Sequence, residues 1–126
     1  MEMEMEMEME MEMDFEKLRG LVPAVIQDEA NGELLMVGFM NSEALDKTLQ
    51  SGYVTFFSRT RERLWTKGET SGNRLRVVEA WTDCDRDTVL FRVNVEGEGK
   101  VCHTGTRSCF TERLPVRAGA GVEARL

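Results

Sequence analysis

The chain has 126 residues, a hydrophobic fraction of 41% and three cysteines. This length suits one domain, since a single hydrophobic core usually forms from ~100–150 residues. No run approaches the ~18–20 apolar residues of a membrane span, and no basic segment leads into an apolar one as in a secretion signal. We therefore expect a cytoplasmic protein with no membrane partner. An odd number of thiols without a secretion signal favours free cysteines or metal ligands over disulfides.

The formal net charge of −7 comes mostly from the N-terminus, because six of the 23 acidic residues lie in Met1–Glu12, a strict Met-Glu alternation. The remainder carries 16 basic and 17 acidic residues, so its charge gives no support for a nucleic-acid partner. Glutamates at i,i+4 oppose a helix, and a lone acidic strand has nothing to pair with. We expect residues 1–13 to form a disordered tail and residues 14–126 to form a single domain.

The first elements are predicted to be a short helical turn and a β-hairpin. Asp14 can N-cap a turn over Phe15–Arg19, which Gly20 ends. Leu21–Gln27 contains β-branched residues and Pro23, as is typical of a first or edge strand. An Asn-Gly turn follows and leads into the apolar run Leu34–Met40, so these two segments are expected to pair.

One convincing helix is predicted over Ser42–Ser51, with Asn41-Ser42 as its N-terminal signal and Gly52 at its end. The remaining strands are expected at Tyr53–Ser58, Leu64–Lys67, Leu75–Thr82 and Thr88–Val95. Loops are expected at Arg59–Arg63, Gly68–Asn73 and Glu96–Lys100, and no patterned element follows Phe110. The fold class is therefore α+β, a mostly antiparallel β-sheet with one main helix at about 42–51.

Three aspartates alternate in Asp83–Asp87. If this segment is extended, Asp83, Asp85 and Asp87 share one face and Cys84 points to the other. Carboxylates gathered in this way repel one another unless a cation neutralises them, and oxygen ligands suit Mg²⁺ or Ca²⁺. A calcium-loop motif is excluded because Thr88 stands where its turn glycine belongs. A solvated acidic turn is the alternative.

The thiols indicate a second kind of metal site. Cys102 and Cys109 are seven residues apart, a weak zinc signal by itself, and buried inert cysteines are the alternative. The polar, glycine-containing loop between them argues against a buried apolar role. Three thiolates, with Cys84 as the third, would bind Zn²⁺ and leave one position for water. His103, the only histidine, is a candidate fourth ligand or, by preference, a general base.

Anion-binding side chains cluster in a third region. Ser58–Arg63 supplies arginines at alternate positions, and Lys67–Asn73 supplies a lysine, hydroxyls and two glycines. The candidate phosphate-binding residues are Arg59, Arg61, Lys67, Thr70 and Ser71. The order of residues is not that of a Walker A loop, and an ordinary hairpin loop is an equal alternative.

Taken together, four ordered motifs closely resemble the phosphoribosyl-AMP cyclohydrolase family. They are Ser58-Arg59, Leu64-Trp65-x-Lys67-Gly68-Glu69-Thr70-Ser71-Gly72-Asn73, Asp83-Cys84-Asp85-x-Asp87 and Cys102-His103-Thr104-Gly105-x-x-Ser108-Cys109-Phe110. The resemblance runs from about Leu34 to Phe110. Because the four motifs occur in order, they are far more specific than any one of them.

The resemblance implies an enzyme of histidine biosynthesis that hydrolyses the N1–C6 bond of the adenine ring of phosphoribosyl-AMP. It further implies an intertwined homodimer with Zn²⁺ and Mg²⁺. By position, Asp83, Asp85 and Asp87 match the Mg²⁺ ligands. Cys84, Cys102 and Cys109 match the Zn²⁺ ligands, with Cys84 donated by the other subunit. Some members carry a second domain, and with 16 residues after Phe110 we expect a monofunctional chain.

This chemistry agrees with the residues, since a metal lowers the pKa of bound water from ~16 towards ~7. His103 is then the expected base for the zinc water, and Mg²⁺ would engage a phosphate or the developing charge. Two other classes stay open: a binding module whose zinc is purely structural, and a different zinc hydrolase or deaminase acting on a nucleotide.

Overall fold

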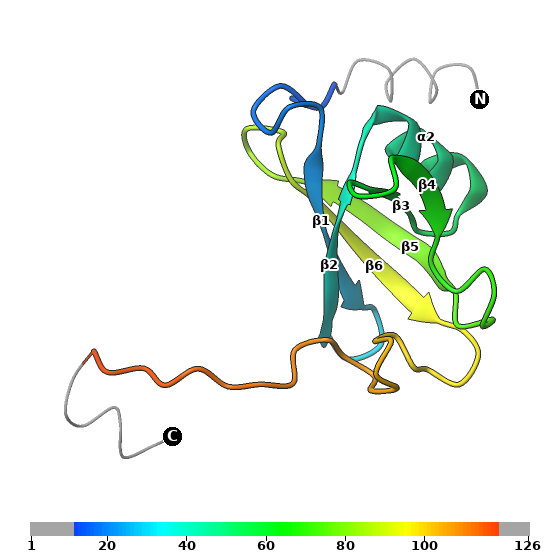
Figure 1. The fold of residues 1–126 in the computed structure, drawn as a ribbon, viewed down its shortest axis with the longest axis vertical. Helices are drawn as coiled ribbons and strands as arrows, with labels where there is room; N and C mark the ends of the chain where they lie inside the picture. The colour runs from blue at the N-terminus through cyan, green and yellow to red at the C-terminus, as the bar shows by residue number, and fades with distance from the viewer. Residues whose placement is uncertain (1–11, 119–126) are drawn as a thin grey trace.

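The computed structural model describes residues 12–118, and the Met-Glu tail lies outside this range except for Glu12 and Met13 (Figure 1). Met13 is partly buried against the core. In chain order the elements are β1 (Val22–Asp28), β2 (Leu34–Met40), α2 (Ser42–Ser51), β3 (Thr55–Ser58), β4 (Arg63–Thr66), β5 (Leu75–Thr82) and β6 (Val89–Val95). The predicted α+β class is confirmed. No helix in the described part is long and apolar enough to cross a membrane.

The main sheet has four strands in the order β2-β1-β6-β5, and every neighbouring pair is antiparallel except β1 with β6. Alternate residues of β1 and β6 are buried, as expected for strands with one face on the core. Leu21–Gln27 was expected to form a first or edge strand. It is the first strand, β1, but the expectation of an edge was wrong, because β1 lies inside the sheet. Pro23 is tolerated there because the ladder to β6 begins only at Ala24.

The helix α2 has the predicted bounds. The Asn41 side chain accepts a hydrogen bond from the Ala44 amide at 2.9 Å, and Gly52 ends the helix with a φ of 83°. Buried Thr48 joins the helix to β3, since its Oγ1 donates to the Ala44 carbonyl and accepts from the Thr55 amide.

The β3–β4 hairpin forms a separate two-stranded sheet beside α2 (Figure 1). The buried ring of Phe56 fixes it against β2, because a Cβ on Gly38 would come within 2.5 Å of that ring. The observed first and last residues of β3 and β4 all lie within two residues of the predicted ones.

The expected helical turn over Phe15–Arg19 is not helical. The segment is a turn in which the Asp14 carboxylate accepts from the Glu16 amide at 3.1 Å and the Gly20 amide donates to the Phe15 carbonyl at 2.6 Å. So short a segment gains little from helical hydrogen bonds. It is joined instead to the turn before β6, since the Asp14 amide donates to the Arg86 carbonyl at 2.7 Å.

Candidate active site

The three aspartates lie in the turn that joins β5 to β6. The expectation of an extended segment was wrong, since Asp83–Asp87 bends and Arg86 has a φ of 59°. The cause is local hydrogen bonding: Oδ1 of Asp83 accepts from the amides of Asp87, at 3.0 Å, and Thr88, at 3.2 Å. Aspartate side chains that bond nearby amides favour turns over strands.

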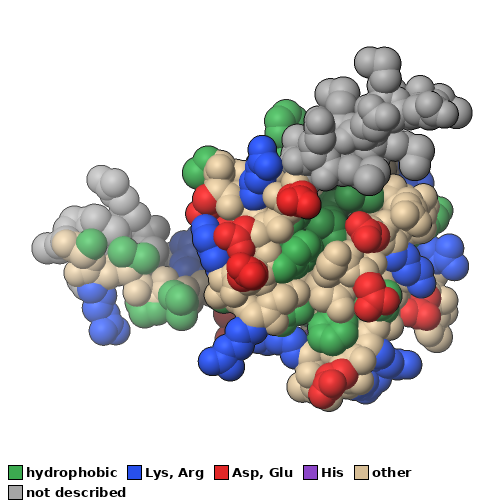
Figure 2. Space-filling view, turned by 90° about the horizontal axis from the view of Figure 1, so that it is seen from above, with side chains coloured by type: hydrophobic (Ala, Val, Ile, Leu, Met, Phe, Trp, Pro, Cys, Tyr) green, Lys and Arg blue, Asp and Glu red, His purple; other side chains and the backbone are tan. Residues whose placement is uncertain are grey.

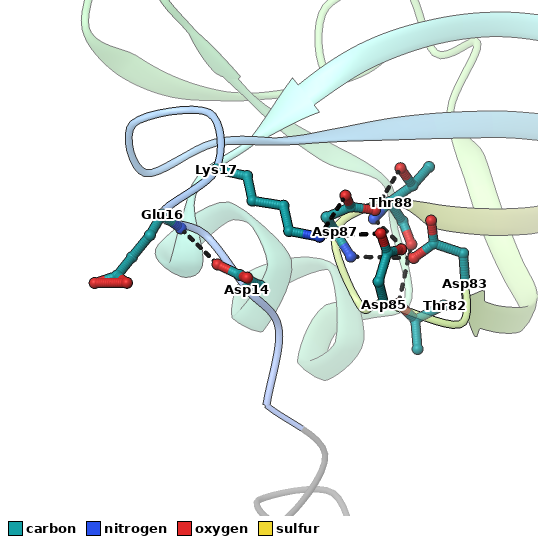
Figure 3. Close-up of polar contacts among 8 residues, drawn as sticks. All are labelled: Asp14, Glu16, Lys17, Thr82, Asp83, Asp85, Asp87 and Thr88. Carbon is teal, nitrogen blue, oxygen red and sulfur yellow. Dashed lines mark hydrogen bonds and ion pairs between the residues drawn. The ribbon is translucent and has the colours of Figure 1, made fainter.

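The turn nevertheless gathers the carboxylates as predicted. One oxygen of each of Asp83, Asp85 and Asp87 lies within 4.8 Å of the others (Figure 3). The ammonium of Lys17 reaches into the cluster, 3.0 Å from Asp85 Oδ2 and 3.2 Å from Asp87 Oδ2. Sequence reasoning missed Lys17, which stands 68 residues from Asp85 and belongs to no motif.

The charged groups of the acidic turn lie close enough to shift one another's pKa values. The hydrogen bond from Lys17 lowers the pKa of Asp85, whereas Asp83 raises the pKa of Asp87. The two carboxylates in turn raise the pKa of Lys17. The cluster therefore holds its negative charge with the help of a cation, and hard oxygen donors of this kind suit Mg²⁺.

Cys102 and Cys109 lie together in an irregular loop at the other end of the sheet, which we call the thiol loop (residues 102–109). The Thr104 hydroxyl donates to Cys102 Sγ at 3.1 Å, and chiefly through this bond the pKa of Cys102 falls to about 6. Partial burial raises the pKa of Cys109, and the neighbouring Cys102 thiol raises it further. Cys102 is thus mostly thiolate at neutral pH, as a zinc ligand must be.

His103 follows Cys102 directly, with Nδ1 4.0 Å from Cys102 Sγ. This position beside a thiolate suits either of the two roles expected for His103, a fourth zinc ligand or a general base.

Cys84 does not join these two thiols within one chain. It is exposed in the acidic turn that precedes β6, whereas the thiol loop follows β6 (Figure 1). Seven strand residues extend for about 20 Å, so the two places lie at opposite ends of the sheet.

The predicted phosphate-binding residues divide into two groups. Arg61, Thr70 and Ser71 line a cavity of about 530 Å³ beside the β3–β4 hairpin. Its other lining residues are Ser58, Arg63, Leu64, Trp65, Thr66, Gly68 and Glu69. Arg59 instead stacks 4.3 Å over the Phe39 ring, and Lys67 lies 5.9 Å from the Trp65 ring. Arg63 was noted as one of the alternating arginines but was not among the candidate phosphate-binding residues, although it lines this cavity.

Lys17→Met should strengthen binding of Mg²⁺ or Mn²⁺ to the acidic turn several-fold, because an incoming cation must displace the Lys17 ammonium. Isothermal titration with Mn²⁺ measures this. The matched control is Lys100→Met, which removes an exposed lysine paired with Glu98 at 3.4 Å. Equal or weaker affinity in Lys17→Met would contradict the competition.

Thr104→Val should raise the pKa of Cys102 from about 6 towards the ordinary thiol range, because the thiolate loses its main hydrogen-bond donor. The thiolate fraction, and with it the rate of alkylation, then falls at pH 7. Mass spectrometry of metal-free protein alkylated at a series of pH values follows Cys102 separately. Thr104→Ser keeps a hydroxyl and should behave as wild type, and a shared midpoint for all three proteins would refute the assignment.

Known proteins resemble this chain over most of its length. A family model for phosphoribosyl-AMP cyclohydrolase matches residues 36–111. The phosphoribosyl-AMP cyclohydrolase of Solibacter usitatus is 58% identical over 101 residues, covering 80% of this chain and 79% of the relative. That of Citrifermentans bemidjiense is 56% identical over 110 residues, covering 87% and 86%.

Longer proteins match as well. The histidine biosynthesis bifunctional protein HisIE of Escherichia coli is 61% identical over 97 residues, covering 77% of this chain and 47% of the relative. The chain spans about half the length of these bifunctional relatives. Since the family model covers more than half of the chain and the shorter relatives align over most of their length, the resemblance in the motifs is confirmed, and the chain belongs to the phosphoribosyl-AMP cyclohydrolase family.

Proposed function

We propose that two copies of this chain form an intertwined homodimer in which each active site takes ligands from both subunits and uses a zinc-activated water. The reaction follows from the family: hydrolysis of the N1–C6 bond of the adenine ring of phosphoribosyl-AMP, a step of histidine biosynthesis. We further propose that the enzyme acts in the cytoplasm, where its three cysteines stay reduced.

The observation that carries the proposal is the separation of Cys84 from Cys102 and Cys109. Three thiolates would match a zinc site with one open position, but one chain brings only two of them together. In a symmetric dimer, Cys84 of one subunit can approach the thiol loop of the other, and the same contact repeats at a second site. The donor set therefore fits zinc if two chains contribute.

Exposed apolar side chains along β5 support such a contact. This strand forms an edge of the sheet, and its exposed residues include Val78 and Trp81, which is 60% accessible. An exposed edge strand with large apolar side chains is typical of a protein interface. Figure 2 shows acidic and basic side chains intermixed with apolar ones on the face of the molecule that is seen from above.

Zinc, when bound, would supply a Lewis acid that lowers the pKa of a water molecule beside the thiolates. Nε2 of His103 is the atom to which we assign the water proton, since Nδ1 faces Cys102. Asp83, Asp85 and Asp87 would hold Mg²⁺. Arg61, Thr70 and Ser71, in the 530 Å³ cavity, would hold a phosphate, with Arg59 and Lys67 contributing charge at its margin.

Purified protein should open the adenine ring of phosphoribosyl-AMP, followed as the loss of adenine absorbance. Protein stripped with a chelator should lose activity, regain part of it with Zn²⁺ and regain the rest with Zn²⁺ plus Mg²⁺. Release of ammonia would identify a deaminase instead. Unchanged absorbance with fully metallated protein, or unfolding as the sole effect of zinc removal, would contradict a catalytic zinc.

His103→Ala should lower kcat by about 10²–10⁴-fold, the usual contribution of a positioned general base, while zinc content stays at the wild-type level. The measurement pairs turnover of phosphoribosyl-AMP with metal analysis of the same sample. His103→Gln, which keeps a polar side chain but cannot accept the proton as a base, should be comparably slow. Near-normal turnover in a zinc-loaded His103→Ala enzyme would remove His103 from this role.

A further inference from the structure

We infer that Arg107 is a positioning residue, which ties the thiol loop to the end of the central strand β1 and so holds Cys102 and Cys109 in the arrangement that binds zinc. This inference rests on the proposed zinc site and extends it to residues that none of the four motifs specifies. Arg107, Asp28 and Glu33 form a three-residue ion cluster, and none of them is a candidate ligand or base.

The buried carboxylate of Asp28 requires a cation such as the Arg107 guanidinium. Among the described residues, Asp28 is the one ionisable residue that is buried, with 3% of its surface accessible. Its Oδ1 accepts from the Ala30 amide at 2.9 Å, and its Oδ2 accepts from Nη2 of Arg107. A buried carboxylate is costly unless a cation compensates it, so the position of the Arg107 guanidinium is strongly determined.

A second carboxylate fixes the orientation of the guanidinium. Nε of Arg107 donates to Glu33 Oε1 at 3.0 Å, so the planar group bridges the two ends of the β1–β2 turn. A planar fork with several donors can make both bonds at once, which a lysine ammonium does less well. Gly99 allows this approach, since a Cβ there would lie 3.1 Å from Nη1 of Arg107.

The thiol loop needs such an anchor because it has no helix or strand of its own. Cys102 is held in a local turn, in which its amide donates to the Thr106 carbonyl at 3.0 Å. Cys109 is held from the sheet, where its amide donates to the Leu35 carbonyl at 2.7 Å and Ser108 Oγ donates to the Leu34 carbonyl at 2.8 Å. Arg107 lies between Cys102 and Cys109 in sequence, and its ion pairs with Asp28 and Glu33 join this middle part of the thiol loop to the β1–β2 turn.

The test measures zinc affinity rather than activity. Chelator-stripped protein is titrated with Zn²⁺ against a chromogenic chelator, with circular dichroism at the same temperature to verify folding. Arg107→Met should weaken zinc binding by about 10–100-fold, the usual effect of losing a residue that orients metal ligands. Arg107→Lys should restore part of the affinity because it keeps the charge, and Asp28→Asn combined with Arg107→Met should weaken binding by less than the product of the single effects.

The matched control is Arg76→Met, which removes an exposed arginine of β5 paired with Glu96 at 3.7 Å. Its zinc affinity should equal that of wild type. Wild-type affinity in folded Arg107→Met would overturn the inference. If Arg107→Met does not fold, Glu33→Gln decides, since it removes only the exposed arm of the bridge: several-fold weaker zinc binding supports the inference, and unchanged affinity overturns it.

Cys109→Ser separates this inference from the proposed function. Loss of zinc binding in Cys109→Ser together with wild-type affinity in Arg107→Met would overturn only the positioning role. Wild-type affinity in Cys109→Ser would overturn the zinc site itself, and the inference with it.

Discussion

The parallel pairing of β1 with β6 at the centre of the sheet is the constraint on which the arrangement of the site depends. It runs from Ala24 opposite Val89 to Asp28 opposite Val93, so both strands begin at one end of the sheet and finish at the other. The segment before β1 therefore meets the turn before β6, where Lys17 contacts Asp85 and Asp87. At the far end, Asp28 at the end of β1 meets Arg107 in the loop after β6.

This geometry keeps two different chemistries apart. Hard carboxylate oxygens gather at one end and soft thiolates at the other, and the two kinds of donor would suit different classes of metal. The third thiol, Cys84, lies among the carboxylates, at the wrong end for its own chain. A second copy of the chain would bring the two ends together, which links metal binding, oligomerisation and catalysis in one requirement.

Local patterns predicted local structure well. Asn41 caps the start of α2 and Gly52 ends it, and the Asn-Gly turn joins β1 to β2 as a hairpin. Interior β1 was mistaken for an edge because its parallel partner, β6, follows some 60 residues later, beyond the reach of any hairpin signal. Alternation of the aspartates suggested a strand, whereas the Asp83 side chain bonds nearby amides and forms a turn. The motifs indicated which residue types could bind metal. Lys17 and Arg107 make contacts with segments far away in the sequence, which no motif spacing reveals.

A purified heterodimer tests most directly whether one zinc site needs two chains. One subunit carries Cys84→Ser and the other Cys109→Ser, each with its own affinity tag, so that one of the two sites keeps all three thiols. If the site is shared, this heterodimer keeps about half of the wild-type activity, while both parent homodimers and a Cys102→Ser/Cys109→Ser heterodimer stay inactive. A Cys84→Ser/Cys109→Ser heterodimer as inactive as its parents would contradict a site shared between subunits.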